Sequence, residues 1–153
     1  MQSEVREPTD LTYEEFEAYC EGFIKQAWVD LCLENVCQWQ LEIVKGIENH
    51  EQAWTTIRQY HPNIMIHIAQ DKCATFDDVR SYLQHELGHC LAFQYSQFYL
   101  IYAKGKEMEF NLVDEAFSNR LEKIVSMCGL GEKWHKSGLD NVPACAHGGV
   151  RGE

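Results

Sequence analysis

The stretch "SYLQHELGHCLAFQ" (residues 81–94) contains two histidines that flank a glutamate with the spacing HExxH. On a helical wheel with about 100° per residue, His85 and His89 lie about 40° apart, and Glu86 lies about 100° from His85. The far side of this wheel is apolar and holds Leu83, Leu87, Cys90 and Leu91. The stretch therefore predicts an amphipathic helix whose front carries both histidines and the glutamate.

Helical and strand periodicities alternate around this stretch. The capping box "TYEE" (12–15) precedes apolar residues at three- and four-residue spacing, which predicts a helix over 13–34. Three strands are predicted at 39–46, 53–60 and 64–69, the last two as an antiparallel hairpin. A second capping box at 75–78 starts the HExxH helix, which we expect to run on toward Gly105. Another helix is predicted over 111–129, ended by Gly129 in a left-handed conformation.

These elements predict an α+β fold in which a small, mostly antiparallel sheet packs against helices. The 153 residues are enough for a single domain, and 45% of them are hydrophobic. We expect residues 1–10 and about 137–153 to be loosely ordered, because the stretch from 130 onward is rich in glycine.

Charge and targeting patterns restrict the partners. The net charge is −11 with scattered Lys and Arg, so nucleic acid is a poor partner. The start "MQSEVREPTD" has no secretory apolar region, and no apolar run is long enough to span a membrane. We therefore expect a cytoplasmic protein without a membrane partner, in which the seven cysteines are reduced thiols and mostly buried.

The HExxH pattern is chemically suited to a zinc ion. Histidines at i and i+4 can direct both imidazoles at one metal, and a catalytic zinc takes three protein ligands and one water. Bound to zinc, that water ionises near neutral pH, and Glu86 is in position to accept its proton. With 7 histidines in the chain, the pattern alone can also arise by chance, so a third ligand is the test.

The helix predicted at 111–129 offers a third ligand in "DEAFSNR" (114–120). Glu115 borders the apolar arc formed by Ala116, Phe117, Leu121 and Ile124, where a carboxylate can point toward a neighbouring helix. Asp114 is the competing ligand, but it lies nearly opposite the middle of that arc and is expected to be solvated. Asn119, one turn after Glu115, is a candidate for orienting a ligand.

"HELGH" followed by "DEAFSNRLE" resembles the zincin metallopeptidases of the branch with glutamate as third ligand, the gluzincins. The order of elements over about 39–125 is also similar to compact zincin-like proteins of phages and prophages and to the ImmA/IrrE group. The resemblance implies one zinc ion held by His85, His89 and Glu115, with Glu86 as catalytic acid and base. Where the thermolysin pattern has an acid one turn after the glutamate, this chain has Asn119.

The predicted activity is hydrolysis of a peptide bond in a peptide or protein substrate, through a zinc-bound water that Glu86 activates. Candidate donors to the oxyanion are Tyr95, Tyr99, Tyr102 and His135. By analogy with zincins, Thr55, Thr56 and Ile57 belong to an edge strand that binds the substrate backbone, although the sequence equally allows a central strand. The alternative function is a zincin-fold interaction or regulatory module that binds the metal without general peptidase activity.

Overall fold

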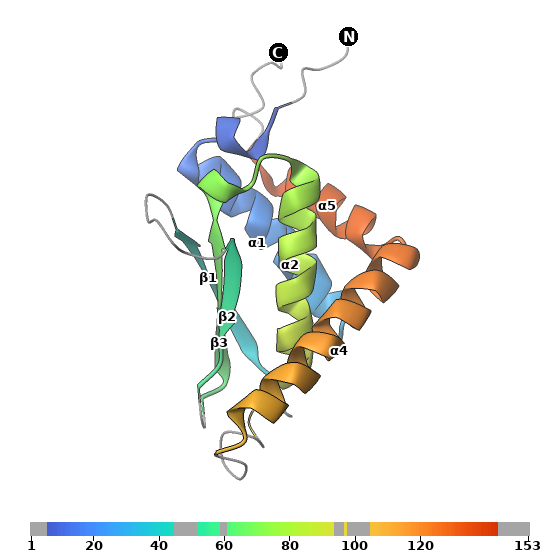
Figure 1. Ribbon diagram of the computed structural model, residues 1–153. Coiled ribbons are helices and arrows are strands. Elements are labelled where there is room, and N and C mark those ends of the chain that lie inside the picture. The colour runs from blue at the N-terminus through green and yellow to red at the C-terminus, as the bar shows by residue number, and fades with distance from the viewer. Residues whose placement is uncertain (1–5, 45–51, 59–60, 94–96, 98–104, 144–153) are drawn as a thin grey trace, which may run out of the picture.

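The computed structural model describes residues 6–44, 52–58, 61–93, 97 and 105–143, and these form an α+β fold (Figure 1). The helices of this part are α1 (Tyr13–Asp30), α2 (Phe76–Leu91), α4 (Glu107–Met127) and α5 (Leu130–Asn141). The strands are β1 (Gln38–Val44), β2 (Ala53–Thr56) and β3 (Asn63–Ala69), and two short 3-10 turns span Pro8–Asp10 and Gln70–Lys72. The α+β class is as predicted.

Both predicted capping boxes start their helices. Thr12 Oγ1 accepts a hydrogen bond from the Glu15 backbone N–H, and Thr75 Oγ1 accepts one from that of Asp78. Each acid bonds back to the backbone N–H of its threonine, which satisfies donors that the first helical turn leaves free. α1 ends at Asp30 rather than at 34, because Cys32 has a positive φ of 60° that a helix cannot continue through.

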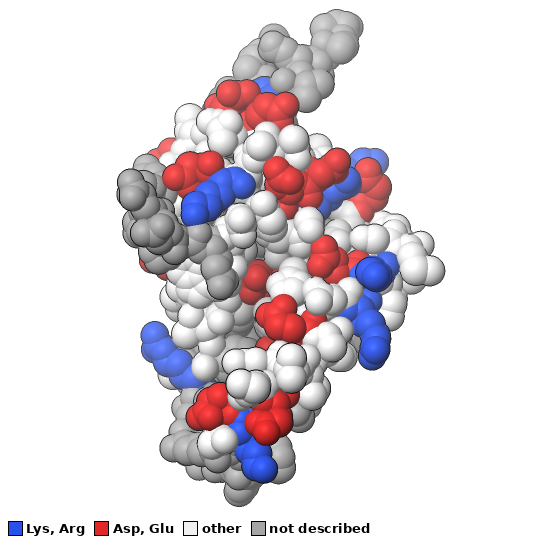
Figure 2. Space-filling view, viewed as in Figure 1, with Lys and Arg blue, Asp and Glu red and all other residues white. Residues whose placement is uncertain are grey.

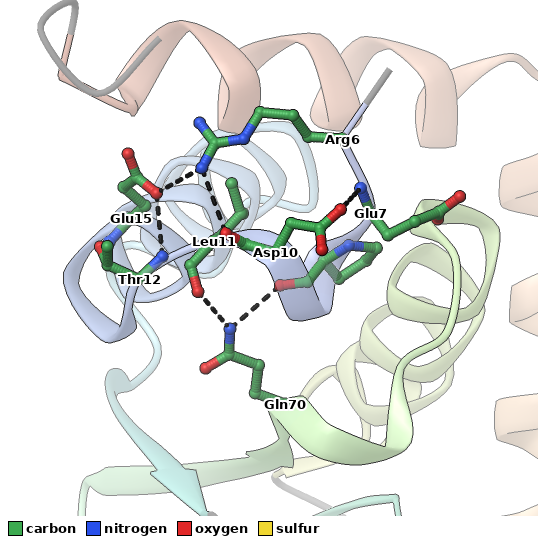
Figure 3. Close-up of polar contacts among 8 residues, drawn as sticks. Arg6, Glu7, Asp10, Leu11, Thr12, Glu15 and Gln70 are labelled. Carbon is green, nitrogen blue, oxygen red and sulfur yellow. Dashed lines mark hydrogen bonds and ion pairs between the residues drawn. The ribbon is translucent and has the colours of Figure 1, made fainter. Parts of the chain in front are cut away.

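The segment before α1 is tied to the rest of the fold (Figure 3). Gln70 donates hydrogen bonds of 3.0 Å to the carbonyl oxygens of both Pro8 and Leu11. Arg6 pairs with the Glu15 carboxylate at 3.0 Å. Residues 6–10 are therefore anchored, which differs from the loose order predicted for 1–10. Residues 1–5 lie outside the described part of the chain.

The sheet is mixed, so the prediction of a mostly antiparallel sheet is wrong. The strand order is β1-β3-β2, with β1 parallel to β3 and β2 antiparallel to β3. The predicted hairpin between β2 and β3 is confirmed. β2 lies at the far edge, antiparallel to β3, and the chain then returns through the middle of the sheet. β1 and β3 then run the same way, which their local sequence patterns do not reveal.

One face of the sheet forms the core with the helices. Ile64, Ile66 and Ile68 alternate along β3 and are fully buried. On the other face, Gln38, Gln40 and Glu42 of β1 are exposed. α2 contacts β2 and β3 on the buried face, and α4 and α5 lie beyond it (Figure 1). This arrangement places the HExxH helix between the sheet and α4.

α5 overlaps the stretch from about 137 that was predicted to be loosely ordered, and the chain is helical there up to Asn141. Trp134 is fully buried against α1, where its ring meets Phe23 at a centroid distance of 5.8 Å. Its indole N–H donates to Asp30 Oδ2 at 2.8 Å. Gly138 is a contact point rather than a loop residue, because a Cβ there would lie 2.7 Å from the Tyr19 carbonyl oxygen. Gly129 has the predicted left-handed conformation, with φ at 76°.

The described cysteines are free thiols, as predicted. Cys20, Cys37, Cys73 and Cys90 are buried, and Cys32 and Cys128 are exposed. Burial raises the pKa of Cys37 to about 11, which keeps that thiol protonated at neutral pH. Within the described ranges, no helix combines the length and apolar character that crossing a membrane requires.

Candidate metal centre

The front of α2 carries the three motif side chains, as the wheel predicts. The rings of His85 and His89 lie edge to face with centroids 5.0 Å apart. Both histidines are partly buried, whereas Glu86 is 5% exposed. Behind them, Leu83, Leu87 and Cys90 are buried in the core. Core packing of the helix back thus fixes which side chains face α4.

Glu115 of α4 lies between the two histidines. Its Oε1 is 3.1 Å from His85 Nε2, and its Oε2 is 3.3 Å from His89 Nε2. One ligand atom from each of the three residues lies within 4.8 Å of the others. Two atoms bound to one tetrahedral zinc at about 2.0–2.1 Å are roughly 3.3 Å apart. The donor set and its spacing therefore fit a zinc ion, and they fit Glu115 as third ligand better than Asp114.

Asp114 holds His89 from the other side of its ring. Its Oδ2 lies 2.7 Å from His89 Nδ1, and Ser118 Oγ lies 3.2 Å from the same nitrogen. An ionised carboxylate only accepts hydrogen bonds, so Nδ1 carries a proton beside Asp114, and in the neutral imidazole the lone pair is then on Nε2, on the Glu115 side. Burial lowers the pKa of His89, but the bond to Asp114 and the nearby carboxylates outweigh it, so the pKa is raised.

The face of α4 that turns to the site differs from the predicted one. Phe117 and Ile124 of the predicted buried arc are 40% and 53% exposed. The helix instead packs through a stripe at spacings of four, three and four: Asp114, Ser118, Leu121 and Val125. Asp114 is consequently 14% exposed rather than solvated. Asn119, which was predicted to orient one of the candidate metal ligands, is exposed. Asp114 and Ser118 instead contact one of those ligands, at His89 Nδ1.

Gly88 allows the two helices to approach at the motif itself. A Cβ at this position would lie 2.8 Å from Ser118 Cα and 2.9 Å from Ser118 Oγ. Such distances are shorter than any van der Waals contact, so a side chain at residue 88 would push α4 away. The glycine within "HELGH" is therefore the reason that Asp114 and Glu115 reach the histidines.

A further carboxylate lies beside His85. Glu122 Oε1 is 3.6 Å from His85 Nδ1, and its Oε2 accepts a hydrogen bond of 2.8 Å from the Ser81 hydroxyl. Each histidine thus has Glu115 on its Nε2 side and another acid on its Nδ1 side. Glu122 was not among the site residues predicted from the sequence.

Glu86 makes its closest contact with the sheet. Thr55 of β2 donates a hydrogen bond of 2.6 Å from Oγ1 to Glu86 Oε1. Burial raises the pKa of Glu86 above its usual value, and the Thr55 hydrogen bond and the two histidines offset this only in part. A carboxyl group with a raised pKa in a cavity is a common feature of functional sites.

The site opens into a cavity of about 870 Å³ between β2, α2 and α4. Its wall includes Gln52 and the β2 residues Ala53 to Thr55, the motif residues, and Asp114, Glu115 and Glu122. It also includes Tyr82, Phe110 and Asn111, which sequence reasoning did not identify. Figure 2 shows acidic side chains over the region of α2 and α4 on this face.

The remaining predicted site residues lie elsewhere or outside the described part. His135 lies on α5 with Nδ1 2.6 Å from the Tyr19 hydroxyl and its ring against Phe76, at the opposite end of α2 from His85. Burial and the charge of Arg80 lower its pKa. His135 is therefore not brought to the candidate metal centre. Tyr95, Tyr99 and Tyr102 fall outside the described residues.

The predicted edge strand is at an edge of the described sheet, since β2 pairs with β3 alone among the described strands. Of its three predicted residues, Thr55 and Ile57 line the cavity. Thr56 points to the opposite face, where its hydroxyl lies 2.9 Å from His67 Nε2.

Comparison with protein-family models, with curated proteins and with solved structures gave no match. The function has to be inferred from the geometry of the site.

Proposed function

We propose that this chain is a zinc-dependent metallopeptidase with a zincin-like arrangement of its HExxH helix. The observation that carries the proposal is the convergence of His85, His89 and Glu115 at zinc-ligand spacing on the wall of a cavity that also holds Glu86. Three protein ligands leave a fourth zinc position for water, which is the composition of catalytic rather than structural zinc sites.

Each side chain has a role that its position supports. Zinc, when bound, supplies a Lewis acid that polarises a carbonyl and lowers the pKa of a coordinated water toward neutrality. Glu86 serves as the base that accepts the water proton and then returns it to the leaving amine. Asp114 fixes the ring orientation and tautomer of His89, and Glu122 lies on the equivalent side of His85.

Within the described sheet, the edge of β2 that does not face β3 provides a place for an extended substrate. The Ala69 N–H bonds to the Gln52 carbonyl at 2.8 Å, so these residues form a hydrogen-bonded pair. Hydrogen-bonded pairs alternate along an antiparallel ladder, which makes Trp54 with His67 the next one. The N–H and C=O groups of Ala53 and Thr55 consequently point away from β3. They can pair with a peptide that lies in the cavity.

The charge of the cavity favours neutral or basic peptides. Glu86, Asp114, Glu115 and Glu122 line it, and none of the described residues in its wall is Lys or Arg. A zinc ion would neutralise only part of this charge. Acidic peptides would therefore meet a repulsive field near the scissile bond.

The test uses the protein loaded with zinc and an unstructured peptide library. Glu86→Gln is expected to keep one zinc per chain and to lose at least about a hundredfold in kcat, because a general base contributes roughly 10²- to 10⁴-fold. Glu115→Ala is expected to lose the zinc. Asn119→Ala, on the same helix but exposed, is the matched control and should resemble the wild type. Equal inertness of wild type and Glu86→Gln on all peptides would contradict the proposal.

A second candidate function is a metal-stabilised interaction module without peptidase activity. Six large apolar side chains on α4 are at least 40% exposed, an arrangement common at binding surfaces: Met108, Leu112, Val113, Phe117, Ile124 and Met127. Under this alternative, zinc raises the melting temperature equally in the wild type and in Glu86→Gln, and neither cleaves any peptide.

A further inference from the structure

We propose that Thr55 is a positioning residue that holds Glu86 for catalysis and ties this base to the strand that binds the substrate. The inference rests on the proposed function, since it assigns a role within that same site. Two observations meet at this one residue. Its hydroxyl bonds to the glutamate of the motif, and its backbone lies at the free edge of the described sheet.

The buried position of Glu86 makes its partner important. A glutamate has three rotatable side-chain bonds, and Glu86 is only 5% exposed as a residue, so contacts within the protein have to hold its side chain in place. Thr55 supplies the hydrogen bond at 2.6 Å, in the short range typical of a hydroxyl that donates to an ionised carboxylate. The bond is made at Oε1, and because each carboxylate oxygen has two lone pairs, the group keeps acceptor capacity for the proton that the base must accept.

The strand gives Thr55 the rigidity that this role needs. A threonine on a strand has few χ1 rotamers because its Cβ is branched. β2 is paired with β3, and the partner of Thr55 in the ladder is the fully buried Ile66. The hydroxyl is thus fixed to the core through the sheet, whereas Glu86 is fixed to it through α2. The two elements meet at this bond.

The same residue also connects the base to the substrate. By the alternation of the ladder, the N–H and C=O groups of Thr55 point to the free edge. A peptide that pairs with these groups would be bound by the backbone of Thr55, whose side chain also holds Glu86. Thr55 would therefore set the position of the peptide relative to Glu86. Catalysis would then depend on the Thr55 hydroxyl while binding depends on its backbone, so the two can be separated by substitution.

The experiment measures kcat, KM and zinc content of the full chain on an unstructured peptide. Thr55→Val keeps the branched shape and the backbone but lacks the hydroxyl. We expect a loss of about tenfold to a hundredfold in kcat, part of the roughly 10²- to 10⁴-fold worth of a general base, with KM within about twofold and one zinc per chain. Thr55→Ser restores the hydroxyl and should recover kcat to within about threefold.

Thr56→Val is the matched control, since it removes a hydroxyl from the same strand on the face away from the site. It should leave kcat and KM unchanged. If Thr55→Val does not fold, Thr55→Ala removes the same hydroxyl without the branched methyl groups. Circular dichroism and the melting temperature identify the folded variants.

The outcomes separate this inference from the proposed function. A wild type that cleaves peptides with a Thr55→Val variant of equal kcat overturns the role of Thr55 and leaves the proposed function standing. A Thr55→Val variant that loses zinc or changes only KM also overturns it. A wild type that cleaves nothing, like Glu86→Gln, overturns the proposed function and this inference with it.

Discussion

The helix pairs α1–α5 and α2–α4 both cross closely at a glycine, but the side chains around the two crossings differ in chemistry. In each pair a glycine lets the helices approach: Gly138 meets the backbone of Tyr19, and Gly88 meets Ser118. Around Gly138 the contact is aromatic, with Phe23 and Trp134 in the core. Around Gly88 it is ionisable and consists of two histidines and the acids of α4.

The difference indicates that the α1–α5 crossing stabilises the fold and that the α2–α4 crossing lowers the free energy of unfolding. Burying aromatic side chains stabilises a small domain, whereas gathering several carboxylates at the edge of a cavity opposes folding unless something binds them. Close approach of α2 and α4 is therefore expected to serve the site, and that of α1 and α5 to serve the core. Substitutions in the two pairs should give different results.

The largest effect on stability is expected from Trp134→Ala. This change removes the fully buried indole and its bond to Asp30. We expect a loss of about 3–5 kcal/mol in the free energy of unfolding, measured with urea, as for other buried aromatic residues. Zinc affinity per folded chain should stay the same. A loss below about 1 kcal/mol would show that the α1–α5 pair is not the stabilising one.

A smaller effect is expected from a methyl group at each crossing. Gly88→Ala and Gly138→Ala both force a Cβ into contact at under 3.0 Å, which costs about 1–3 kcal/mol of unfolding free energy. Only Gly88→Ala should also weaken zinc binding, measured by competition with a chelator, because α4 carries Glu115. If Gly138→Ala weakens zinc binding equally, the two crossings are not separable.

Asp114→Asn tests the support of His89 with almost no change in shape. The amide can still meet Nδ1 but lacks the charge that fixes the tautomer. Loss of such a partner typically weakens metal binding about 10- to 100-fold. Zinc titration of Asp114→Asn beside Asn119→Ala, which should bind as the wild type does, gives the comparison. Equal affinities for both variants would remove Asp114 from the site.

The smallest effect is a pH dependence in the α1–α5 pair. Burial raises the pKa of Asp30, but hydrogen bonds from Trp134, Lys133 and Gln26 outweigh it, so the pKa is lowered. A lowered pKa means that the ionised carboxylate stabilises the fold above its unfolded pKa, near 4, and that this part is lost as the pH falls through the folded value. Asp30→Asn should therefore lose stability relative to the wild type at pH 6 and less at pH 3, by urea unfolding. If the difference in unfolding free energy between Asp30→Asn and the wild type were the same at pH 6 and pH 3, the proposed contribution of the Asp30 carboxylate would be contradicted.

The sequence predicted those parts of the site that depend on one helix at a time. The front of α2 follows from the spacing of His85, Glu86 and His89, and its start follows from the Thr75 capping box. The position of Asp114 was not predictable in the same way, because α4 turns a stripe with Ser118 toward α2 and leaves Phe117 exposed. Hydrophobic periodicity instead predicts that Phe117 is buried and Asp114 is solvated. The cue was the pair of small residues, Gly88 and Ser118, that permits close approach.

The remaining differences come from contacts distant in sequence. α5 contains Gly131 and Gly138, which weaken helix propensity, but Trp134 and its partners on α1 stabilise it. β1 pairs in parallel with β3, which lies 19 residues or more along the chain, so the local pattern of β1 does not contain its direction. Thr55 reaches Glu86 across 31 positions in the sequence, which no local pattern encodes.

The short length of β2 has a consequence for what the proposed enzyme would cut. Ala53 and Thr55 offer two N–H and two C=O groups at the free edge, and only an extended segment with unoccupied backbone groups can pair with them. Segments inside a folded helix or a central strand have those groups engaged already. The conformation of the target would then decide cleavage as much as its sequence. A partner that holds the segment folded would protect it, and local unfolding would expose it.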